Sequence, residues 1–341
     1  MKVHYLTIPL LAGLIAVAVL DSIAVAQGFH VPATISREAR GASAEFSGDR
    51  SRLPKPDDIE GWKKAWEENE EAQQKENEAV TKKFGATVEK LELGGVPVLD
   101  VRPKNWEDNG KVLIYTHGGA YTLFSAASTL ISSVPVADAT GLRVISVDYT
   151  VPPTARWKEV TGQVVSVIKA LVEGRYDLKD IAIYGDSAGG GLAAGSVLKA
   201  RDEGVGLVAA VVLWSPWSDI TETGDTYSTL RAADPLLVYA DSLENAAAAY
   251  ADPADQKHPY VSPVYGDYSK GFPPTLIQVG TKEIFLSNSI RHYQALDQAG
   301  IAVKLDAYEG MWHVFQAFHW RLPESDIARA KMSNFLKLHL E

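Results

Sequence analysis

The sequence contains no cysteine, and this absence excludes several kinds of chemistry. Without thiols the chain forms no disulfide, holds no thiolate-bound metal and offers no cysteine nucleophile. Positive charge is also scarce, because 33 lysine and arginine residues stand against 43 aspartate and glutamate residues and give a net charge of −10. This balance argues against nucleic acids and anionic membranes as partners. The sequence has no metal-ligand cluster and no phosphate-binding loop, so it implies no metal and no cofactor.

The first 26 residues have the features of a signal peptide. Lys2 gives a short positive start, an apolar run extends from Leu6 to Leu20, and Ala24-Val25-Ala26 fits a cleavage site. We therefore expect the mature chain to begin at Gln27 and to be periplasmic or secreted, with no stable membrane partner. The apolar run is shorter than the roughly 20 residues that span a bilayer. An uncleaved anchor is the alternative.

The chain, with 46% hydrophobic residues, is long enough for one large α/β domain. Residues 27–56 are rich in proline and polar residues, and we interpret them as an irregular lead-in. A cap helix is expected over residues 57–84, which completes an N-terminal part that ends at residue 86. The middle of this helix, Glu67 to Glu78, is almost wholly polar. We interpret this charged stretch as a solvent-exposed face and not as a binding site.

From residue 87 onward, apolar strands alternate with helices. Residues 87–93 and 96–101 flank Gly94-Gly95 and predict an antiparallel hairpin. The later alternation predicts an α/β fold, with a mostly parallel sheet covered by helices on both faces, in a catalytic domain of residues 87–341. It stops between about residues 217 and 260, which we interpret as a helical cap insertion over the carboxyl ends of the strands. Further strands are expected at 112–116, 143–147, 181–184, 208–213, 275–279 and 303–308, and helices at 159–173, 242–250, 287–299 and 325–340.

The strongest chemical signal is the stretch from Gly185 to Gly189, which joins an apolar strand to a small-residue helix. Gly-x-Ser-x-Gly in this position is typical of a nucleophile elbow, a sharp turn that exposes a serine hydroxyl above the strand ends. The two glycines leave room where the strand and the helix approach each other. Ser187 is therefore the candidate nucleophile. An idle serine in a glycine-rich connection is the alternative.

A second signal, His117-Gly118-Gly119-Ala120, directly follows an expected strand. Glycines at this place free backbone N–H groups to face a cavity, and acyl transfer needs such donors to stabilise the oxyanion of the tetrahedral intermediate. We expect the amides of Gly118, Gly119 and Ala120 to form this oxyanion hole together with that of Ala188, which begins the helix after the elbow. We interpret His117 as a residue that holds the loop through hydrogen bonds, and not as a base.

Two later loops supply the partners that a serine nucleophile needs. A serine hydroxyl needs an imidazole to accept its proton, and the imidazole needs a carboxylate to orient it. Glu283 and His313 each follow an expected strand, so both lie at the same sheet edge as Ser187. No aspartate occurs between residues 281 and 290, and a solvated loop carboxylate is the alternative for Glu283. His319, in an expected helix, is assigned a structural role.

These stretches resemble the hormone-sensitive-lipase-like branch of the α/β-hydrolases, the bacterial family IV esterases and their monoterpene ε-lactone hydrolase relatives. The resemblance implies an α/β-hydrolase fold, a cap built from the N-terminal helices and the 217–260 insertion, and an ester hydrolase without a cofactor. The sequence departs from the family at Ala120, where a third glycine is usual, and at residues 149–153, where the family usually has Tyr-Arg-Leu-Ala-Pro-Glu. The matching stretches are His117 to Ala120, Gly185 to Gly190, Ser215 to Asp219, Asp234 to Leu236, Gly280 to Glu283 and Gly310 to His313.

We therefore expect a serine carboxylesterase that hydrolyses short- to medium-chain esters through an acyl-enzyme on Ser187. A lactonase or arylester hydrolase with the same triad is the alternative. A ligand-binding protein on an inactive hydrolase fold is a third possibility, but such a protein is expected to lack the catalytic histidine. The sequence leaves the oligomeric state open, a homodimer included. Aromatic residues that flank the catalytic stretches are expected to line the substrate pocket, namely Tyr121, Phe124, Trp217, Phe285 and Trp312.

Overall fold

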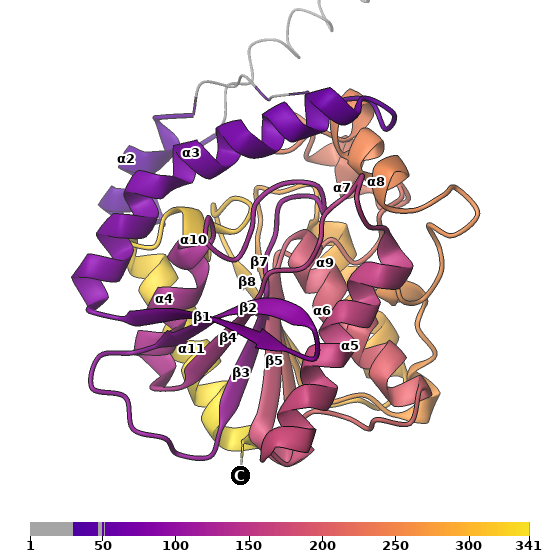
Figure 1. Cartoon of the computed structure of the whole chain (residues 1–341). Coiled ribbons are helices and arrows are strands. Elements are labelled where there is room, and N and C mark those ends of the chain that lie inside the picture. Colours follow the sequence, from indigo (N-terminus) through magenta and orange to yellow (C-terminus); the bar gives the residue numbers. More distant parts are fainter. Residues whose placement is uncertain (1–29, 47–49, 51, 341) are drawn as a thin grey trace, which may run out of the picture.

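The computed structural model of the chain describes residues 30–46, 50 and 52–340. The predicted signal peptide, residues 1–26, lies outside the described residues. Among the helices of the described part, none is both long enough and apolar enough to cross a membrane. The described chain folds around one eight-stranded sheet with helices on both sides, which confirms the predicted α/β class (Figure 1).

The strands are β1 (Thr87–Leu93), β2 (Val96–Arg102), β3 (Val112–Thr116), β4 (Arg143–Val147), β5 (Ile181–Asp186), β6 (Ala210–Trp214), β7 (Thr275–Gly280) and β8 (Val303–Tyr308). They lie side by side in the order β1-β2-β4-β3-β5-β6-β7-β8. β1 and β2 form the predicted antiparallel hairpin, β2 is antiparallel to β4, and all other neighbours are parallel. Every residue of β3 and β5 is buried, as expected for central parallel strands covered on both faces.

Helices pack on the two faces of the sheet. α4 (Leu130–Thr140) and α11 (Pro323–His339) cover one face, and α5 (Trp157–Gly174), α6 (Ala188–Asp202) and α9 (Leu286–Gln298) cover the other (Figure 1). Ile183 and Tyr184 of β5 belong to different apolar clusters, because successive strand side chains point to opposite faces. α4 was not among the predicted helices. It contains Pro135, which ordinarily ends a helix, but seven of its residues are buried and tertiary packing maintains it.

The lead-in contains a helix, which corrects the interpretation of residues 27–56 as irregular. α2 (Arg37–Ser43) begins after Ser36, whose hydroxyl oxygen accepts a hydrogen bond from the Ala39 amide at 2.9 Å. The Ser36 amide and hydroxyl also donate to the Glu324 carboxylate of α11. Ala39 is fully buried. The contacts with Glu324 join residues 288 positions apart, so they leave no local sequence pattern.

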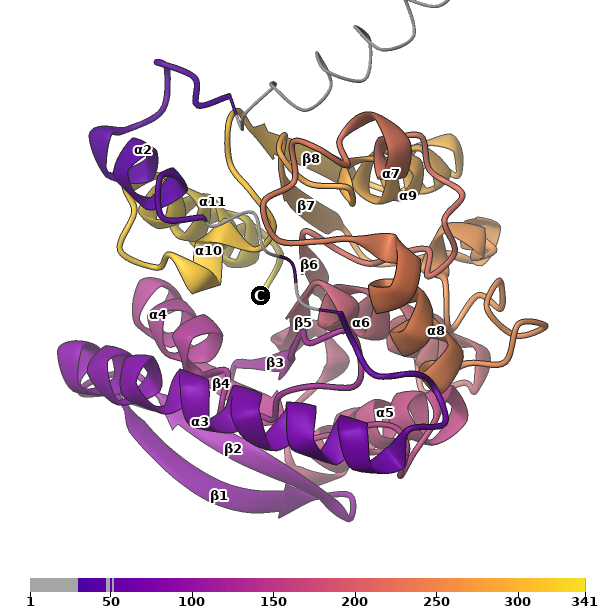
Figure 2. The ribbon, with the colours of Figure 1, turned by 90° about the horizontal axis from the view of Figure 1, so that it is seen from above.

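Above the carboxyl ends of the strands lie the N-terminal helix and the 217–260 insertion. α3 (Ile59–Phe84) confirms the helix predicted over residues 57–84, and only Trp62, Asn77 and Val80 of it are buried. Figures 1 and 2 show α3 crossing this side of the sheet, with α7 (Thr226–Thr229) and α8 (Glu244–Tyr250) of the insertion nearby. The short helix α10 (Phe315–Phe318) completes this layer. The candidate catalytic residues lie beneath it.

Candidate active site

Ser187 occupies the sharp turn between β5 and α6. Its backbone has φ 54° and ψ −123°, a conformation that costs a residue with a side chain and that persists only where its surroundings enforce it. Two backbone hydrogen bonds of 2.8 Å do so here. The Ser187 amide donates to the Trp214 carbonyl, and the Ser187 carbonyl accepts from the Trp217 amide. The end of β6 therefore fixes the serine in its strained turn.

The elbow packs directly against the end of β3. A Cβ atom on Gly189 would lie 2.1 Å from the Thr116 carbonyl oxygen and 2.4 Å from that of His117, and one on Gly185 would lie 2.2 Å from the Gly189 carbonyl oxygen. All three distances are far below van der Waals contact, so both positions require glycine. The Thr116 hydroxyl donates to the Gly189 carbonyl at 2.7 Å. This contact places the loop after β3 beside Ser187.

Glu283 and His313 lie together, although they come from different loops. The His313 Nδ1 atom is 2.9 Å from Glu283 Oε2. The other carboxylate oxygen, Oε1, accepts hydrogen bonds from the Gly280 amide at 2.7 Å and the Ser215 hydroxyl at 2.8 Å. A carboxylate can only accept, so His313 donates from Nδ1, and in the neutral ring this tautomer leaves the lone pair on Nε2. His313 and Ser187 both line the cavity described below.

Ser215 was part of a matched stretch but had no predicted role. Besides donating to Glu283, its hydroxyl oxygen accepts a hydrogen bond from the Val314 amide at 3.0 Å. Ser215 is fully buried and follows β6. It therefore connects the loop of the acid to the loop of the histidine. The signals available in the sequence were its place in a matching stretch and its position after a buried strand at the same sheet edge.

Asp234 connects the cap insertion to the loop of the acid. Its Oδ2 atom accepts a hydrogen bond from the Ile284 amide at 2.8 Å, and Oδ1 accepts from the amides of Leu236 and Leu237. Burial raises the pKa of this carboxyl group to about 6. The Leu236 and Leu237 side chains in turn line the cavity at Ser187. One side chain thus fixes the Glu283 loop relative to a wall of that cavity.

The loop after β3 presents only part of the predicted oxyanion hole. Gly119 and Ala120 line the cavity at Ser187, whereas Gly118 and Ala188 do not. The Gly118 amide lowers the pKa of the nearby Asp186 carboxyl group, and its assignment as a donor to the oxyanion stays a prediction. Within the described part of the chain, no acceptor takes a hydrogen bond from the amides of Gly119, Ala120 or Ala188. These three remain available as donors.

Asp186, next to the nucleophile, joins the elbow to this loop. Burial raises the pKa of its carboxyl group to about 6, against the opposing effects of the Tyr115 hydroxyl hydrogen bond, His313 and the Gly118 amide. Its side chain lies close enough to Gly118 that a Cβ atom there would be 2.4 Å from Asp186 Oδ2. Asp186 therefore positions the loop that carries the candidate oxyanion donors.

His117 holds the same loop, as the sequence predicted. Its ring stacks on that of Tyr149 with centroids 4.0 Å apart, and the Tyr149 hydroxyl donates to the His117 carbonyl at 2.7 Å. The His117 Nδ1 atom is 2.8 Å from the Gly118 carbonyl oxygen. Complete burial lowers the pKa of His117 to about 4, so the ring is neutral. His117 does not line the cavity, and it is not placed to act as a base there.

Helix α3 anchors the far end of this loop. Ala120, Tyr121 and Phe124 all have positive φ angles, between 52° and 66°, so the loop needs support from outside. The Trp66 indole donates to the Phe124 carbonyl at 3.0 Å. One turn further along α3, Glu70 accepts a hydrogen bond from the Ser125 hydroxyl at 2.8 Å. The N-terminal helix is thus part of the support of the candidate oxyanion hole.

The cavity at Ser187 has a volume of about 430 Å³ and mostly aliphatic walls. Four of the predicted pocket residues, Tyr121, Trp217, Phe285 and Trp312, do not line it, so that prediction was wrong. They are completely buried beneath it, and Phe285 packs edge-on against His313 with ring centroids 5.1 Å apart. Phe124 does line it. The walls also include Leu53, Leu123, Pro235, Leu236, Leu237, Val238, Leu243 and Phe318.

His319 lines the cavity in addition to the structural role that was predicted for it. The Trp312 indole N–H donates to His319 Nδ1 at 3.0 Å, so Nδ1 carries no proton. Burial lowers the pKa of His319, which keeps the ring neutral. The remaining ring proton is therefore on Nε2.

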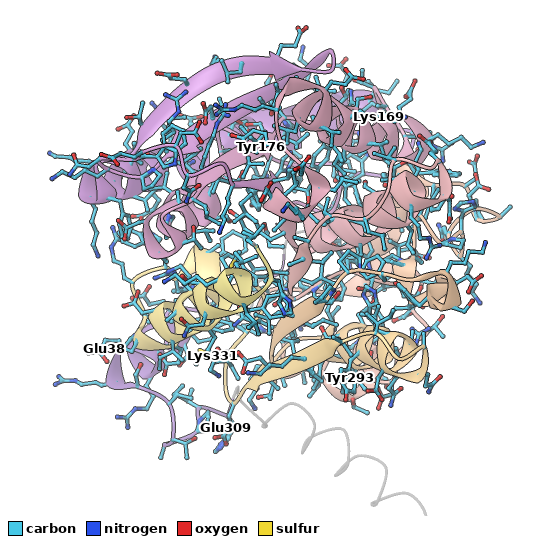
Figure 3. All side chains as sticks on the ribbon, turned by 90° about the horizontal axis from the view of Figure 1, so that it is seen from below. Glu38, Lys169, Tyr176, Tyr293, Glu309 and Lys331 are labelled. Atoms are coloured by element: carbon cyan, nitrogen blue, oxygen red, sulfur yellow. The ribbon has the colours of Figure 1, made fainter. Side chains whose placement is uncertain are left out.

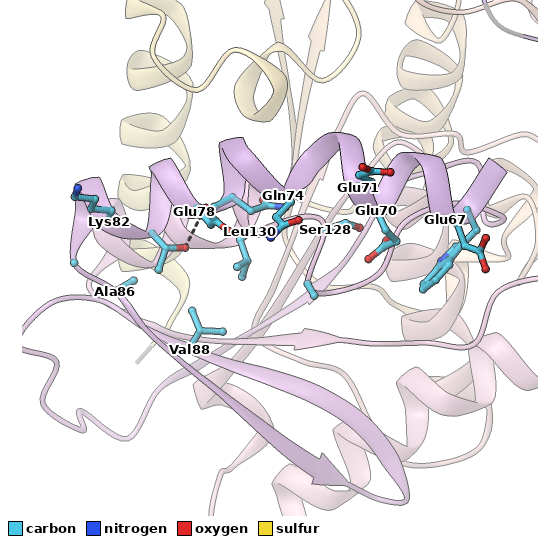
Figure 4. Close-up of a pocket in the computed structure, with 15 residues that line it drawn as sticks. Glu67, Glu70, Glu71, Gln74, Glu78, Lys82, Ala86, Val88, Ser128 and Leu130 are labelled. Atoms are coloured by element: carbon cyan, nitrogen blue, oxygen red, sulfur yellow. Dashed lines mark hydrogen bonds between the residues drawn. The ribbon is translucent and has the colours of Figure 1, made fainter. Parts of the chain in front are cut away.

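A larger groove, of about 980 Å³, runs along α3 on the side of β1 and does not include the candidate catalytic residues (Figure 4). Glu67, Glu70, Glu71 and Glu78 of the charged stretch border it, above an apolar floor that includes Val88 and Leu130. Most of this stretch is exposed, as predicted, but one side of it faces the groove. Of the described His, Asp and Glu residues, no three are grouped so that they could hold a metal ion.

Known proteins are similar to this chain in fold and in sequence. A family model described as the alpha/beta hydrolase fold matches residues 113–317. An acetyl-hydrolase from Streptomyces hygroscopicus is 35% identical over 237 residues, which cover 70% of this chain and 78% of that protein. This chain belongs to the α/β-hydrolase family.

Solved structures place the chain within that family. The crystal structure of esterase E25 superposes with a TM-score of 0.85 at 30% identity and covers 91% of this chain and 96% of its own. An esterase of the bacterial hormone-sensitive lipase family matches with a TM-score of 0.71 at 28% identity, over 82% of this chain and 98% of its own. These matches support the hormone-sensitive-lipase-like branch of the α/β-hydrolases, in agreement with the motifs.

Proposed function

We propose that this α/β-hydrolase is a serine carboxylesterase that acts through an acyl-enzyme on Ser187. The observation that carries the proposal is the pairing of His313 with buried Glu283 in a cavity shared with a serine on a strained elbow. The relatives named esterase and acetyl-hydrolase act on the same class of bond, which supports an ester as the substrate.

The geometry supports the following sequence of steps. In the neutral imidazole of His313, Nδ1 donates to Glu283 and Nε2 carries the lone pair, which accepts the proton of the Ser187 hydroxyl as its oxygen attacks the ester carbonyl. The amides of Gly119, Ala120 and Ala188 stabilise the oxyanion. His313 then passes the proton to the departing alkoxide, which leaves an acyl group on Ser187. Water, activated in the same way, releases the acid and restores the serine.

Substrate size follows from the cavity. Its aliphatic walls and modest volume suit an acyl chain of about two to six carbons, because each methylene buried in an apolar pocket contributes about 0.8 kcal/mol, or roughly fourfold in rate, until the pocket is full. In a series of 4-nitrophenyl esters, kcat/KM is expected to rise with acyl length and then fall. Hydrolysis of emulsified long-chain triglycerides faster than of soluble butyrate esters would contradict this proposal.

The same series of esters can be measured with a variant at Ala120. This residue lines the cavity with φ 52°, a conformation that glycine adopts without strain, so Ala120→Gly removes one methyl group and keeps the backbone amide. The optimum is expected to move toward bulkier acyl groups or tertiary-alcohol esters. An unchanged substrate profile would show that Ala120 does not limit the pocket.

We also propose that the protein is exported with removal of residues 1–26. The basis is the order of a positive start, an apolar run and Ala24-Val25-Ala26 in the sequence. When the full chain is produced in an exporting bacterium, mass spectrometry of the mature protein is expected to find Gln27 at its N-terminus. Recovery of the chain from the membrane fraction with Met1 retained would favour the anchor.

A further inference from the structure

A recess lined by three arginines lies beside the catalytic cavity. Arg50, Arg52 and Arg231 surround it, its volume is about 350 Å³, and Asp241 is the one carboxylate among the described residues that line it. Arg50 and Val238 line both this recess and the cavity that contains Ser187. Positive charge therefore gathers next to the candidate catalytic residues in a chain whose net charge is −10.

Arg50 is held in a fixed orientation toward the two spaces. Its Nη1 atom donates to three backbone carbonyls of one cap segment, those of Arg231 at 2.7 Å, Asp234 at 3.3 Å and Leu237 at 3.1 Å. In the part of the chain that the structure describes, nothing accepts a hydrogen bond from its Nε or Nη2 atoms. This leaves a pre-positioned guanidinium edge, the group that binds carboxylates with two parallel hydrogen bonds.

The other two arginines are only weakly neutralised. Arg52 lies 3.7 Å from Asp241, and Arg231 lies 3.9 Å from Glu222, with all four side chains 44% to 78% exposed. Ion pairs of this kind contribute little in water and exchange readily for another carboxylate. The recess therefore keeps an excess of positive charge that a bound anion can use.

We propose that this recess binds a carboxylate carried by the substrate, so that the enzyme prefers esters with a free carboxylate at a suitable distance from the scissile bond. Arg50 grips the carboxylate through its free edge, and Arg52 and Arg231 add attraction at longer range. The inference rests on the proposed function, because it assumes that esters are cleaved at Ser187. It makes Arg50 a specificity-determining residue.

The test measures a preference ratio. For ethyl esters of linear dicarboxylic acids of increasing length, kcat/KM with a free terminal carboxylate is divided by kcat/KM with a terminal carboxamide. A second series, acetate esters of hydroxyalkanoic acids against the matching amides, places the carboxylate on the alcohol side. In at least one series the ratio is expected to exceed ten at one chain length in low salt, and to decrease as salt screens the charges.

Variants assign that preference to the arginines. Arg50→Met is expected to lower the ratio at least tenfold, and Arg50→Lys, which keeps the charge but not the planar edge, by less. The double variant Arg52→Met/Arg231→Met leaves the contacts of Arg50 with the cap in place and is expected to lower the ratio severalfold. Arg37→Met, at an exposed arginine of α2 outside both spaces, is the matched control.

The outcomes separate the two proposals. If neither the carboxylate-terminated nor the amide-terminated esters are hydrolysed, the proposed function is wrong. If the amide-terminated esters are hydrolysed but every ratio stays near or below one, or if the arginine variants change it no more than Arg37→Met does, the carboxylate site is wrong and the esterase stands.

Discussion

The Ser187→Ala variant is expected to fold normally and to lose about five orders of magnitude in kcat, since removal of a serine nucleophile leaves only binding and oxyanion stabilisation. The alanine keeps the Cβ atom, so the turn at φ 54° gains no strain. Its two supporting hydrogen bonds involve only backbone atoms and are also kept. Hydrolysis of 4-nitrophenyl butyrate measures the loss, and thermal unfolding verifies the fold.

Ser196 provides the control for this variant. It is a second buried serine, it lies on the helix that Ser187 begins, and its hydroxyl has no hydrogen-bond partner in the described chain. Ser196→Ala should therefore leave hydrolysis within a factor of two of the wild type. Activity of Ser187→Ala within tenfold of the wild type would mean that another group attacks the ester.

Much of the site was predictable because each catalytic candidate lies in a local pattern. Strand, glycine turn and helix identify Ser187, and the carboxyl ends of parallel strands meet at one edge, which is why Glu283 and His313 were expected near it. The structure brings those two side chains to 2.9 Å. Their catalytic roles stay predictions until they are tested by substitution.

The parts that could not be predicted depend on contacts between distant segments. Ser215 meets Glu283 across 68 positions and Val314 across 99, and Arg50 meets Leu237 across 187. No spacing rule links such residues. The prediction that aromatic residues line the substrate pocket was largely wrong for a related reason. Phe285 is close to Glu283 in sequence and Trp217 lies in a matching stretch, but their side chains are buried in the core, where their rings stack with centroids 5.6 Å apart.

The Glu283→Gln variant is expected to fold and to lose about three to four orders of magnitude in kcat, less than Ser187→Ala. Glu283 accepts all three of its hydrogen bonds, from Gly280, Ser215 and His313. A glutamine accepts at only one end. With its oxygen kept toward the Gly280 amide, its NH₂ group faces His313 Nδ1, which must then give up its proton. The proton moves to Nε2, and the imidazole can no longer accept from Ser187.

Glu283→Gln is expected to lower kcat and to leave KM nearly unchanged. The reason is that KM depends on the cavity walls, whereas the tautomer of His313 affects kcat. Glu283→Asp, which keeps the charge, is expected to retain more activity than Glu283→Gln. Glu107→Gln, at an exposed loop position, removes one charge without a change in rate. Asp306 is the competing acid, but its carboxylate is bound by Lys331 at 2.7 Å and by Tyr308 and Gln278. Figure 3 labels Lys331 among the side chains of this side of the molecule. If Glu283→Gln were fully active and Asp306→Asn inactive, the acid of the triad would have to be reassigned to β8.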